Sequence, residues 1–457
     1  MKSKATVFQK EATIKSFDIK HRNTIKFNMA RYKAAFEKGF SRYKNPLLAR
    51  ERATYIKRTA LNMLPDLLLE FERNIQKRGV KVFWAETAAE ANNYILNLFL
   101  EKKVKHVVKS KSMTTEELEI NHYLEHNEIE VVETDLGEYI VQIAGEKPYH
   151  IVTPAMHKSK EDVAQLFHEK FNTPINSTPS QITAFVRKKL REKYVAANAA
   201  ITGANFLIAD SGSISLTENE GNGFLSMSFP KIHVVVAGIE KIIPSLRHLP
   251  FMLPWLAVHG TGQNITVYNS IVSAAKQANE IDGPTEMHVV LLDNGRSDLY
   301  GKKPQNEALA CIRCGACLNN CPVYKNIGGY TYAATYSGPI GSVITPFYNG
   351  FKTYQHLSFA SSLCGKCTEI CPVNIPLHKL LLYNRKEAVE AKYSPVMERI
   401  AMKTFGVVMQ NRTLLDFSGH GIKNFAMSFI NKRLWGKHRS KIIFKKPFSS
   451  KSSAHLE

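Results

Sequence analysis

The sequence predicts an α/β protein in which a three-layer α/β domain follows a helical region and precedes a helical, cysteine-bearing module. Three observations lead to this fold class. Short apolar segments alternate with amphipathic segments of helical length from residue 80 onward, the first 78 residues show helical periodicity alone, and all seven cysteines lie between Cys311 and Cys371. Strands that alternate with helices imply crossover units and a parallel sheet.

The amino-terminal region, residues 1–78, is predicted to be helical. In 23–43 and 51–79, apolar residues recur at helical spacing among many Lys, Arg and Glu residues. Gly79 is a helix stop, because glycine is favoured just beyond a last helical turn. We expect these helices to pack on the domain that follows.

The α/β domain is predicted to span residues 79–297. Its expected strands are 80–86, 105–110, 129–134, 206–210, 213–217, 232–238, 265–269 and 287–293. Its expected helices are 87–103, 114–127, 161–170, 180–196 and 241–258. Turn-forming residues in 293–310 mark its end. The cysteine module, 298–393, follows, and a basic region, 394–457, is expected to be helical over 394–440.

The net charge of +21 suggests an acidic partner or an anionic membrane surface, and the alternative, which we favour for most of the charge, is a solvated basic face. Nucleic acid is disfavoured, because no helix-turn-helix, zinc-finger or RNA-binding signature accompanies the charge. The chain shows neither a secretory apolar segment nor a run long enough to cross a bilayer, so we expect a cytoplasmic protein. The segment 429–447 mixes Trp435, Ile442, Ile443 and Phe444 with Lys and Arg, and is either a solvated tail or a peripheral membrane contact.

The first cysteine motif has the pattern C-x2-C-x2-C-x3-C-P, in Cys311, Cys314, Cys317, Cys321 and Pro322. This is the spacing of bacterial ferredoxins, in which three close thiolates hold one 4Fe-4S cluster and the fourth cysteine holds another. Zinc also prefers thiolates, but structural zinc sites use two separated pairs of ligands. The spacing therefore favours iron–sulfur clusters.

The second motif consists of Cys364, Cys367, Cys371 and Pro372, with Ser361 where an opening cysteine is expected. If the motifs exchange ligands, Cys311, Cys314, Cys317 and Cys371 hold a complete first cluster. The second cluster has Cys321, Cys364 and Cys367 only. It is then either a 3Fe-4S cluster or a 4Fe-4S cluster with another fourth ligand.

The candidates for that fourth ligand are hydroxide, an external group, or side chains near the second motif: Ser361, Ser362 and His356. The alternative is that these side chains hydrogen-bond locally. The segment between the motifs, 322–360, is rich in Gly and Tyr. It either shields the clusters from water, which tunes their potential, or forms a docking face for a redox partner.

Several long segments resemble the lactate utilisation protein B family, the iron–sulfur members of a bacterial three-protein lactate oxidation system. They are SLTENEGNG (215–223), HVVVAGIEKIIPSL (233–246), GPTEMHVVLLDNGRS (283–297), ALACIRCGACLNNCPVY (308–324), YSGPIGSVITP (336–346) and SSLCGKCTEICPVNIPLHKLLL (361–382). The resemblance implies that a serine in the second motif is the usual family pattern. It also implies that 79–297 is a lactate utilisation domain, similar to the sugar-isomerase and coenzyme A transferase type of α/β fold.

The function implied by this resemblance is electron transfer in the oxidation of L-lactate to pyruvate. The expected partners are the other subunits of the lactate system and a redox acceptor. Two alternatives stay open: an electron-transfer subunit for another 2-hydroxy acid such as glycolate, or a non-catalytic assembly or regulatory protein whose clusters only hold the module together.

Two stretches of the α/β domain are candidates for binding a carboxylate substrate. Lys109, Lys111 and Ser112 end a predicted strand just before a helix, whose first amides favour an anion. The second stretch is rich in loops and offers Asp210, Ser211, Glu218, Gly221 and Gly223. Ordinary turns and helix caps are the alternative for both. Neither a GxGxxG fingerprint nor a P-loop is present, so the sequence does not support a nucleotide cofactor.

Overall fold

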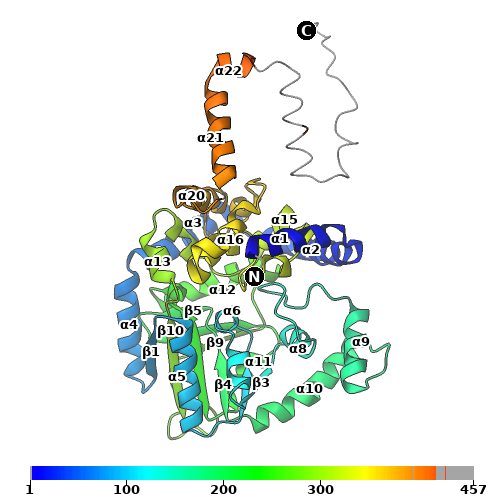
Figure 1. Ribbon diagram of the computed structural model, residues 1–457. Coiled ribbons are helices and arrows are strands. Elements are labelled where there is room, and N and C mark those ends of the chain that lie inside the picture. Colours follow the sequence, from blue (N-terminus) through cyan, green and yellow to red (C-terminus); the bar gives the residue numbers. More distant parts are fainter. Residues whose placement is uncertain (1–2, 395, 418–427, 429–457) are drawn as a thin grey trace. The chain divides into compact units, whose positions relative to one another are not determined.

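The computed structural model describes residues 3–394, 396–417 and 428 (Figure 1). The chain divides after Ala388 into two units, which are described separately. The first unit contains the helical amino terminus, the α/β domain and the cysteine motifs.

Four helices form the amino-terminal region, where the sequence predicts two. They are α1 (Lys4–Phe17), α2 (Ile19–Phe40), α3 (Pro46–Asn62) and α4 (Leu64–Gln76). The predicted helix over 51–79 is interrupted at Met63, because Pro65 in the first turn of α4 has no amide hydrogen to continue the hydrogen bonding of α3. Gly79 has a φ of 79° just beyond α4, as a helix stop requires.

A six-stranded parallel sheet forms the centre of the α/β domain, in the order β1-β10-β7-β4-β2-β3. Its strands are β1 (Lys81–Ala85), β2 (His106–Lys109), β3 (Glu130–Glu133), β4 (Ala199–Thr202), β7 (Ile232–Gly238) and β10 (Glu286–Leu292). The sequence predicts all of them except β4. That strand is AAIT, which is short and rich in alanine and so has little strand signature of its own.

Alternate strand residues point to opposite faces of this sheet and bury two helical layers. Helix α5 (Ala88–Glu101) and α7 (Ile120–Glu125) pack on the face that carries Val234 and Val290. Helix α4 packs on the opposite face at Val289, and α10 (Pro179–Ala196) packs on it at Val108. The three-layer α/β prediction is confirmed (Figure 1).

A smaller mixed sheet, in the order β8-β5-β6-β9, packs with α4 on the second face. Its strands are β5 (Phe206–Ile208), β6 (Ser213–Glu218), β8 (Ile242–Ile243) and β9 (Tyr268–Val272). The predicted helix over 241–258 is wrong in its first half. The chain there forms β8 and a 3₁₀ turn, and α12 (Leu249–Thr261) begins only after Pro244, which disfavours helix at the residue before it.

The remaining helices of the domain connect its strands. They are α6 (Met113–Glu117), α8 (Leu136–Ile143), α9 (Lys160–Phe171) and α11 (Asn222–Ser228). The sequence predicts one helix over 114–127, but the chain divides it into α6 and α7 at Glu119, whose φ of 52° is left-handed. Helix α8 was not predicted, and α9 and α10 lie where they were expected.

The cysteine module consists of short helices around a buried centre. They are α13 (Arg296–Gly301), α14 (Ala316–Asn320), α15 (Pro322–Ile327), α16 (Gly338–Asn349), α17 (Phe351–Tyr354), α18 (His356–Phe359), α19 (Lys366–Glu369) and α20 (Leu377–Glu390). One apolar core joins this module to α2, α3 and α12. Trp255 of α12 is fully buried, and its Nε1 donates a hydrogen bond to the carbonyl of Pro372 at 2.9 Å.

The second unit contains α21 (Val396–Gln410) and α22 (Arg412–Phe417). These helices agree with the first part of the helical prediction over 394–440. The basic segment 429–447, with Trp435, Ile442, Ile443 and Phe444, lies outside the described residues. Over the residues described, no helix combines the length and the apolar character that crossing a membrane requires.

Candidate iron–sulfur site

The two cysteine motifs fold in the same way, as a tight turn followed by a short helix. Arg313 and Leu363, which precede the second cysteine of the pattern, have left-handed φ angles of 60° and 54°. Gly315 and Gly365 follow with φ angles of 76° and 81°, a region that glycine adopts without strain, and begin α14 and α19. Each turn brings closely spaced cysteines onto one side of the chain.

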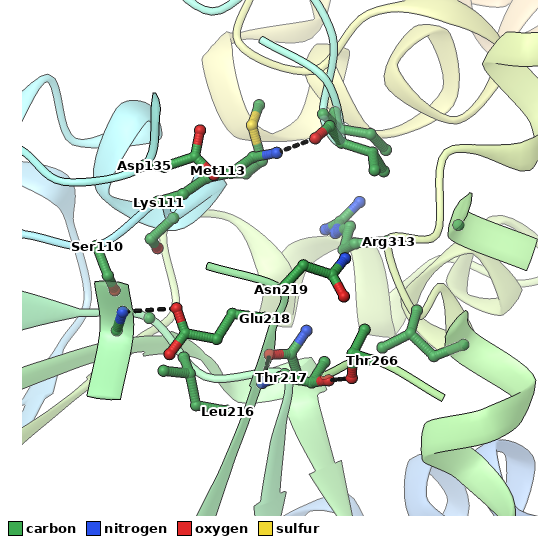
Figure 2. Close-up of a pocket in the computed structure, with 18 of the residues that line it drawn as sticks. Ser110, Lys111, Met113, Asp135, Leu216, Thr217, Glu218, Asn219, Thr266 and Arg313 are labelled. Carbon is green, nitrogen blue, oxygen red and sulfur yellow. Dashed lines mark hydrogen bonds between the residues drawn. The ribbon is translucent and has the colours of Figure 1, made fainter. Parts of the chain in front are cut away.

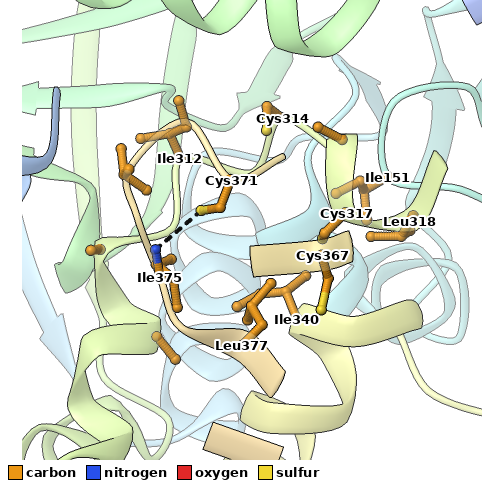
Figure 3. Packing of buried hydrophobic residues seen from close by; sticks show 14 of the residues in the cluster. Ile151, Ile312, Cys314, Cys317, Leu318, Ile340, Cys367, Cys371, Ile375 and Leu377 are labelled. Atoms are coloured by element: carbon orange, nitrogen blue, oxygen red, sulfur yellow. Dashed lines mark hydrogen bonds between the residues drawn. The ribbon is translucent and has the colours of Figure 1, made fainter. Parts of the chain in front are cut away.

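Four cysteines from both motifs line one small cavity. They are Cys311, Cys314, Cys317 and Cys371, and the rest of the cavity wall is mainly apolar. Figure 3 shows Cys314, Cys317 and Cys371 among Ile151, Ile340, Ile375 and Leu377. These are the four residues that ligand exchange between the motifs predicts for the first cluster.

The other three cysteines also lie near one another. Burial, together with the neighbouring Cys321 and Cys364, raises the pKa of the Cys367 thiol to about 11. Cys321 and Cys367 are buried, whereas Cys364 is exposed. The second group of thiols is therefore the one nearer to solvent.

The surroundings of the sulfur atoms suit thiolate ligands. Backbone amides of Arg313, Tyr324 and Ile375 donate hydrogen bonds of 3.4, 3.5 and 3.4 Å to Cys311, Cys321 and Cys371. Such bonds stabilise negative charge on cluster-bound sulfur. Burial and the neighbouring cysteines raise the pKa of the Cys317 thiol. A positively charged iron core fits this donor set.

Two of the candidate side chains for the fourth ligand, Ser361 and His356, have local partners. Ser361 Oγ accepts a hydrogen bond of 3.2 Å from the Leu363 amide, and His356 Nδ1 lies 3.2 Å from the Thr353 carbonyl. Ser362 is exposed. The segment 322–360 contributes Tyr324, Tyr332 and most of α16 to the buried core around the cysteines, which favours shielding over docking as its role.

A second cavity, of about 350 Å³, adjoins the first cysteine group and shares Cys314 with it. It lies between the sheet edges of the α/β domain and the first motif (Figure 2). Four of the candidate carboxylate-binding residues line it: Lys111, Ser112, Glu218 and Gly223. Lys111 donates a hydrogen bond to the carbonyl of Val152.

Four other candidates do not line this cavity: Lys109, Asp210, Ser211 and Gly221. Lys109 is fully buried and paired with Glu116 at 2.8 Å and Glu133 at 2.7 Å. Asp210 accepts a hydrogen bond from the amide of Leu246 at 3.0 Å. At the start of α6, Ser112 Oγ accepts a hydrogen bond from the Thr115 amide, as a helix cap does.

Comparison with known proteins assigns both parts of this arrangement. A family model described as LUD domain matches residues 68–292, and one described as 4Fe-4S dicluster domain matches residues 307–375. A Lactate utilization protein B from Geobacillus sp. (strain WCH70) is 46% identical over 354 residues, which are 77% of this chain and 74% of the relative. The chain belongs to the lactate utilization protein B family.

Other members of the lactate utilization protein B family are similarly close. The relative from Geobacillus thermodenitrificans (strain NG80-2) is 45% identical over 80% of this chain and 78% of its own. That from Bacillus velezensis is 45% identical over 78% of this chain and 75% of its own. A solved DUF162 family protein from Deinococcus radiodurans aligns with 50% of this chain and 98% of its own, at 13% identity and a TM-score of 0.29.

A buried ionic network links the LUD domain to the dicluster domain in this chain. Arg296 binds Glu117 through two hydrogen bonds of 2.9 and 2.8 Å and binds Glu240 at 2.6 Å. Glu240 in turn accepts a 3.0 Å hydrogen bond from Arg313, which directly precedes Cys314 in the first motif. Against the cost of burial, the two arginines hold the pKa of Glu240 well below its usual range.

Sequence reasoning missed this network. Its members are separated by up to 196 positions, from Glu117 to Arg313, and each reads in isolation as an ordinary surface charge. The one local signal was Arg313 itself, a cation inside a cysteine motif.

Proposed function

We propose that this chain is the iron–sulfur electron-transfer component of a complex that oxidises L-lactate to pyruvate. The observation that carries the proposal is the convergence of Cys311, Cys314, Cys317 and Cys371 from two motifs on one cavity, beside a second group of three cysteines. The relatives named Lactate utilization protein B supply the substrate class and imply that other subunits of a lactate system are its partners.

We assign a first 4Fe-4S cluster to Cys311, Cys314, Cys317 and Cys371. A second cluster belongs to Cys321, Cys364 and Cys367, and is either 3Fe-4S or 4Fe-4S with a fourth ligand other than cysteine. When bound, such clusters accept and release single electrons. Because each motif contributes ligands to both sites, the two clusters lie close enough to exchange electrons.

The environments of the two groups give the transfer a direction. The first group is enclosed by Ile151, Ile340, Ile375 and Leu377, which exclude water. In the second group Cys364 is exposed, and Lys325 and Lys366 near it are exposed cations. Electrons therefore leave from the second cluster toward an acidic face of a redox acceptor. The segment 429–447 is our candidate for contact with an anionic membrane surface on the cytoplasmic side.

The test is anaerobic iron and sulfide quantitation with electron paramagnetic resonance, on wild type, Ser361→Cys and the matched control Ser362→Cys. About eight irons per chain indicate two 4Fe-4S clusters, whereas about seven, with a three-iron signal that Ser361→Cys alone removes, indicate a 3Fe-4S second cluster. Zinc in place of iron contradicts the proposal. So do clusters that never change redox state when lactate and the partner subunits are added.

A further inference from the structure

The larger cavity is cationic on the side that adjoins the first cysteine group. Lys241 follows β7 and is only 9% exposed. Among the residues that the structure describes, no oxygen accepts a hydrogen bond from its ammonium group. Arg313 donates a hydrogen bond from Nη2 to Glu240, but its buried Nη1 lacks a partner in the described part of the chain. Two buried cations therefore line the cavity with donors still to be satisfied.

The opposite side of the cavity is acidic. Figure 2 shows Glu218 and Asp135 across the cavity from Arg313. Glu218 accepts hydrogen bonds from the Gly223 and Phe224 amides, and Glu220 accepts one from the Leu136 amide. Each carboxylate retains further lone pairs for a donor in the cavity. Ser110 Oγ, also in the wall, is buried without a partner among the described residues.

These two walls together select the charge of a ligand. Glu240 already pairs with Arg313 through Nη2, but a molecule without acceptor oxygens leaves the ammonium group of Lys241 and the buried Nη1 of Arg313 unsatisfied, which is costly. A dianion such as phosphate is repelled by Asp135, Glu218 and Glu220. A monocarboxylate matches the cationic wall, and hydroxyl groups on the same molecule can donate to the acidic wall. The volume of about 350 Å³ is within the range of small-molecule sites.

We propose that this cavity binds a small hydroxylated monocarboxylate, with its carboxylate held by Lys241 and Arg313 beside Cys314. This inference deepens the proposed function and rests on it for the role of the ligand, since a hydroxy acid bound here lies next to the first cluster. Cys314 lines both cavities, so binding changes the surroundings of the first cluster and leaves those of the second, around Cys364, unaltered.

The test measures binding to the full-length, cluster-containing protein by anaerobic calorimetry and by the paramagnetic resonance of the reduced clusters. The probes are L-lactate, glycolate and D-gluconate, each compared with its neutral amide, and inorganic phosphate. The variants are Lys241→Met and the control Lys231→Met, which removes the same charge from an exposed residue at the other end of β7.

We expect at least one hydroxy acid to bind, its amide and phosphate to bind at least tenfold more weakly, and only the first cluster's signal to change. Lys241→Met should weaken binding at least tenfold, and Lys231→Met should leave it unaltered. Binding of no acid, equal binding of acid and amide, or tighter binding of phosphate overturns the inference. The comparison of acid with amide in the wild type decides it even if Lys241→Met does not fold.

Failure of this inference differs from failure of the proposed function. Protein that contains clusters but binds none of the acids contradicts the inference alone. If iron is replaced by zinc, the electron-transfer proposal fails, and calorimetry on the same protein still shows whether the carboxylate site exists.

Discussion

Lys109 is a candidate for carboxylate binding in the sequence, but in the structure it forms buried ion pairs with other residues of the chain. Its side chain is fully buried and forms ion pairs with Glu116 and Glu133, while Glu138 lies within the same acidic group. Although burial opposes it, these carboxylates raise the pKa of Lys109 above its ordinary value. The lysine is therefore the cation that allows the acidic group to be buried.

Lys109→Met should destabilise the protein by about 3–5 kcal/mol, because it leaves buried carboxylates without their counter-charge. The measurement is the free energy of unfolding in urea at neutral pH. Lys105→Met, four residues earlier and exposed, is the control and should change stability by less than about 0.5 kcal/mol. Equal stability of the two variants contradicts the structural role of Lys109.

At the scale of elements, hydrophobic periodicity and composition predicted those helices and strands whose formation depends on their own residues. The strands with β-branched runs, such as β7 and β10, were predicted because periodicity and composition agree in them. Strand β4 could not be predicted, because it is a strand only through its pairing with β2 and β7. The first half of the 241–258 segment was predicted as helix because it is apolar, whereas Pro244 prevents a helix there. The cysteine ligands could be predicted from spacing, whereas the cavity beside them needs residues from distant elements.

Helix α2 crosses α12 closely through two glycines, and this contact is a second test. A Cβ added at Gly39 would lie 2.3 Å from the carbonyl oxygen of Gly262, which is backbone and cannot move aside. Gly39→Ala should therefore destabilise the protein by about 1–3 kcal/mol. Gly301→Ala, where a Cβ meets nothing within 4 Å, should be neutral or slightly stabilising. Thermal unfolding of both variants checks this, and a neutral Gly39→Ala would show that α2 can move away from α12.

At the scale of the whole first unit, one core and one ionic network join three segments of the chain. The apolar core contains residues of α2, α12 and the cysteine module, and Glu240 bridges Arg296 and Arg313. At this junction the LUD domain and the dicluster domain share one buried core. The LUD domain and the dicluster domain should therefore unfold together, although family models match them as separate segments.

This cooperativity can be measured in wild type and in Glu240→Gln. Far-ultraviolet circular dichroism follows the α/β domain, and the visible absorbance of the clusters follows the cysteine module. We expect one shared transition in wild type. Glu240→Gln should lower the midpoint of both signals together and cost about 3–5 kcal/mol, because it leaves two buried arginines short of a carboxylate.

The matched control for Glu240→Gln is Glu307→Gln, which removes a carboxylate that pairs with Arg58 at 2.7 Å at the surface. Its expected cost is at most about 1 kcal/mol, since both partners are solvated. If cluster absorbance is lost well before the circular dichroism signal in wild type, the module unfolds independently and the network does not join it to the LUD domain. If both midpoints fall together in Glu240→Gln and stay near those of wild type in Glu307→Gln, the buried carboxylate of Glu240 links the cysteine motif to the sheet.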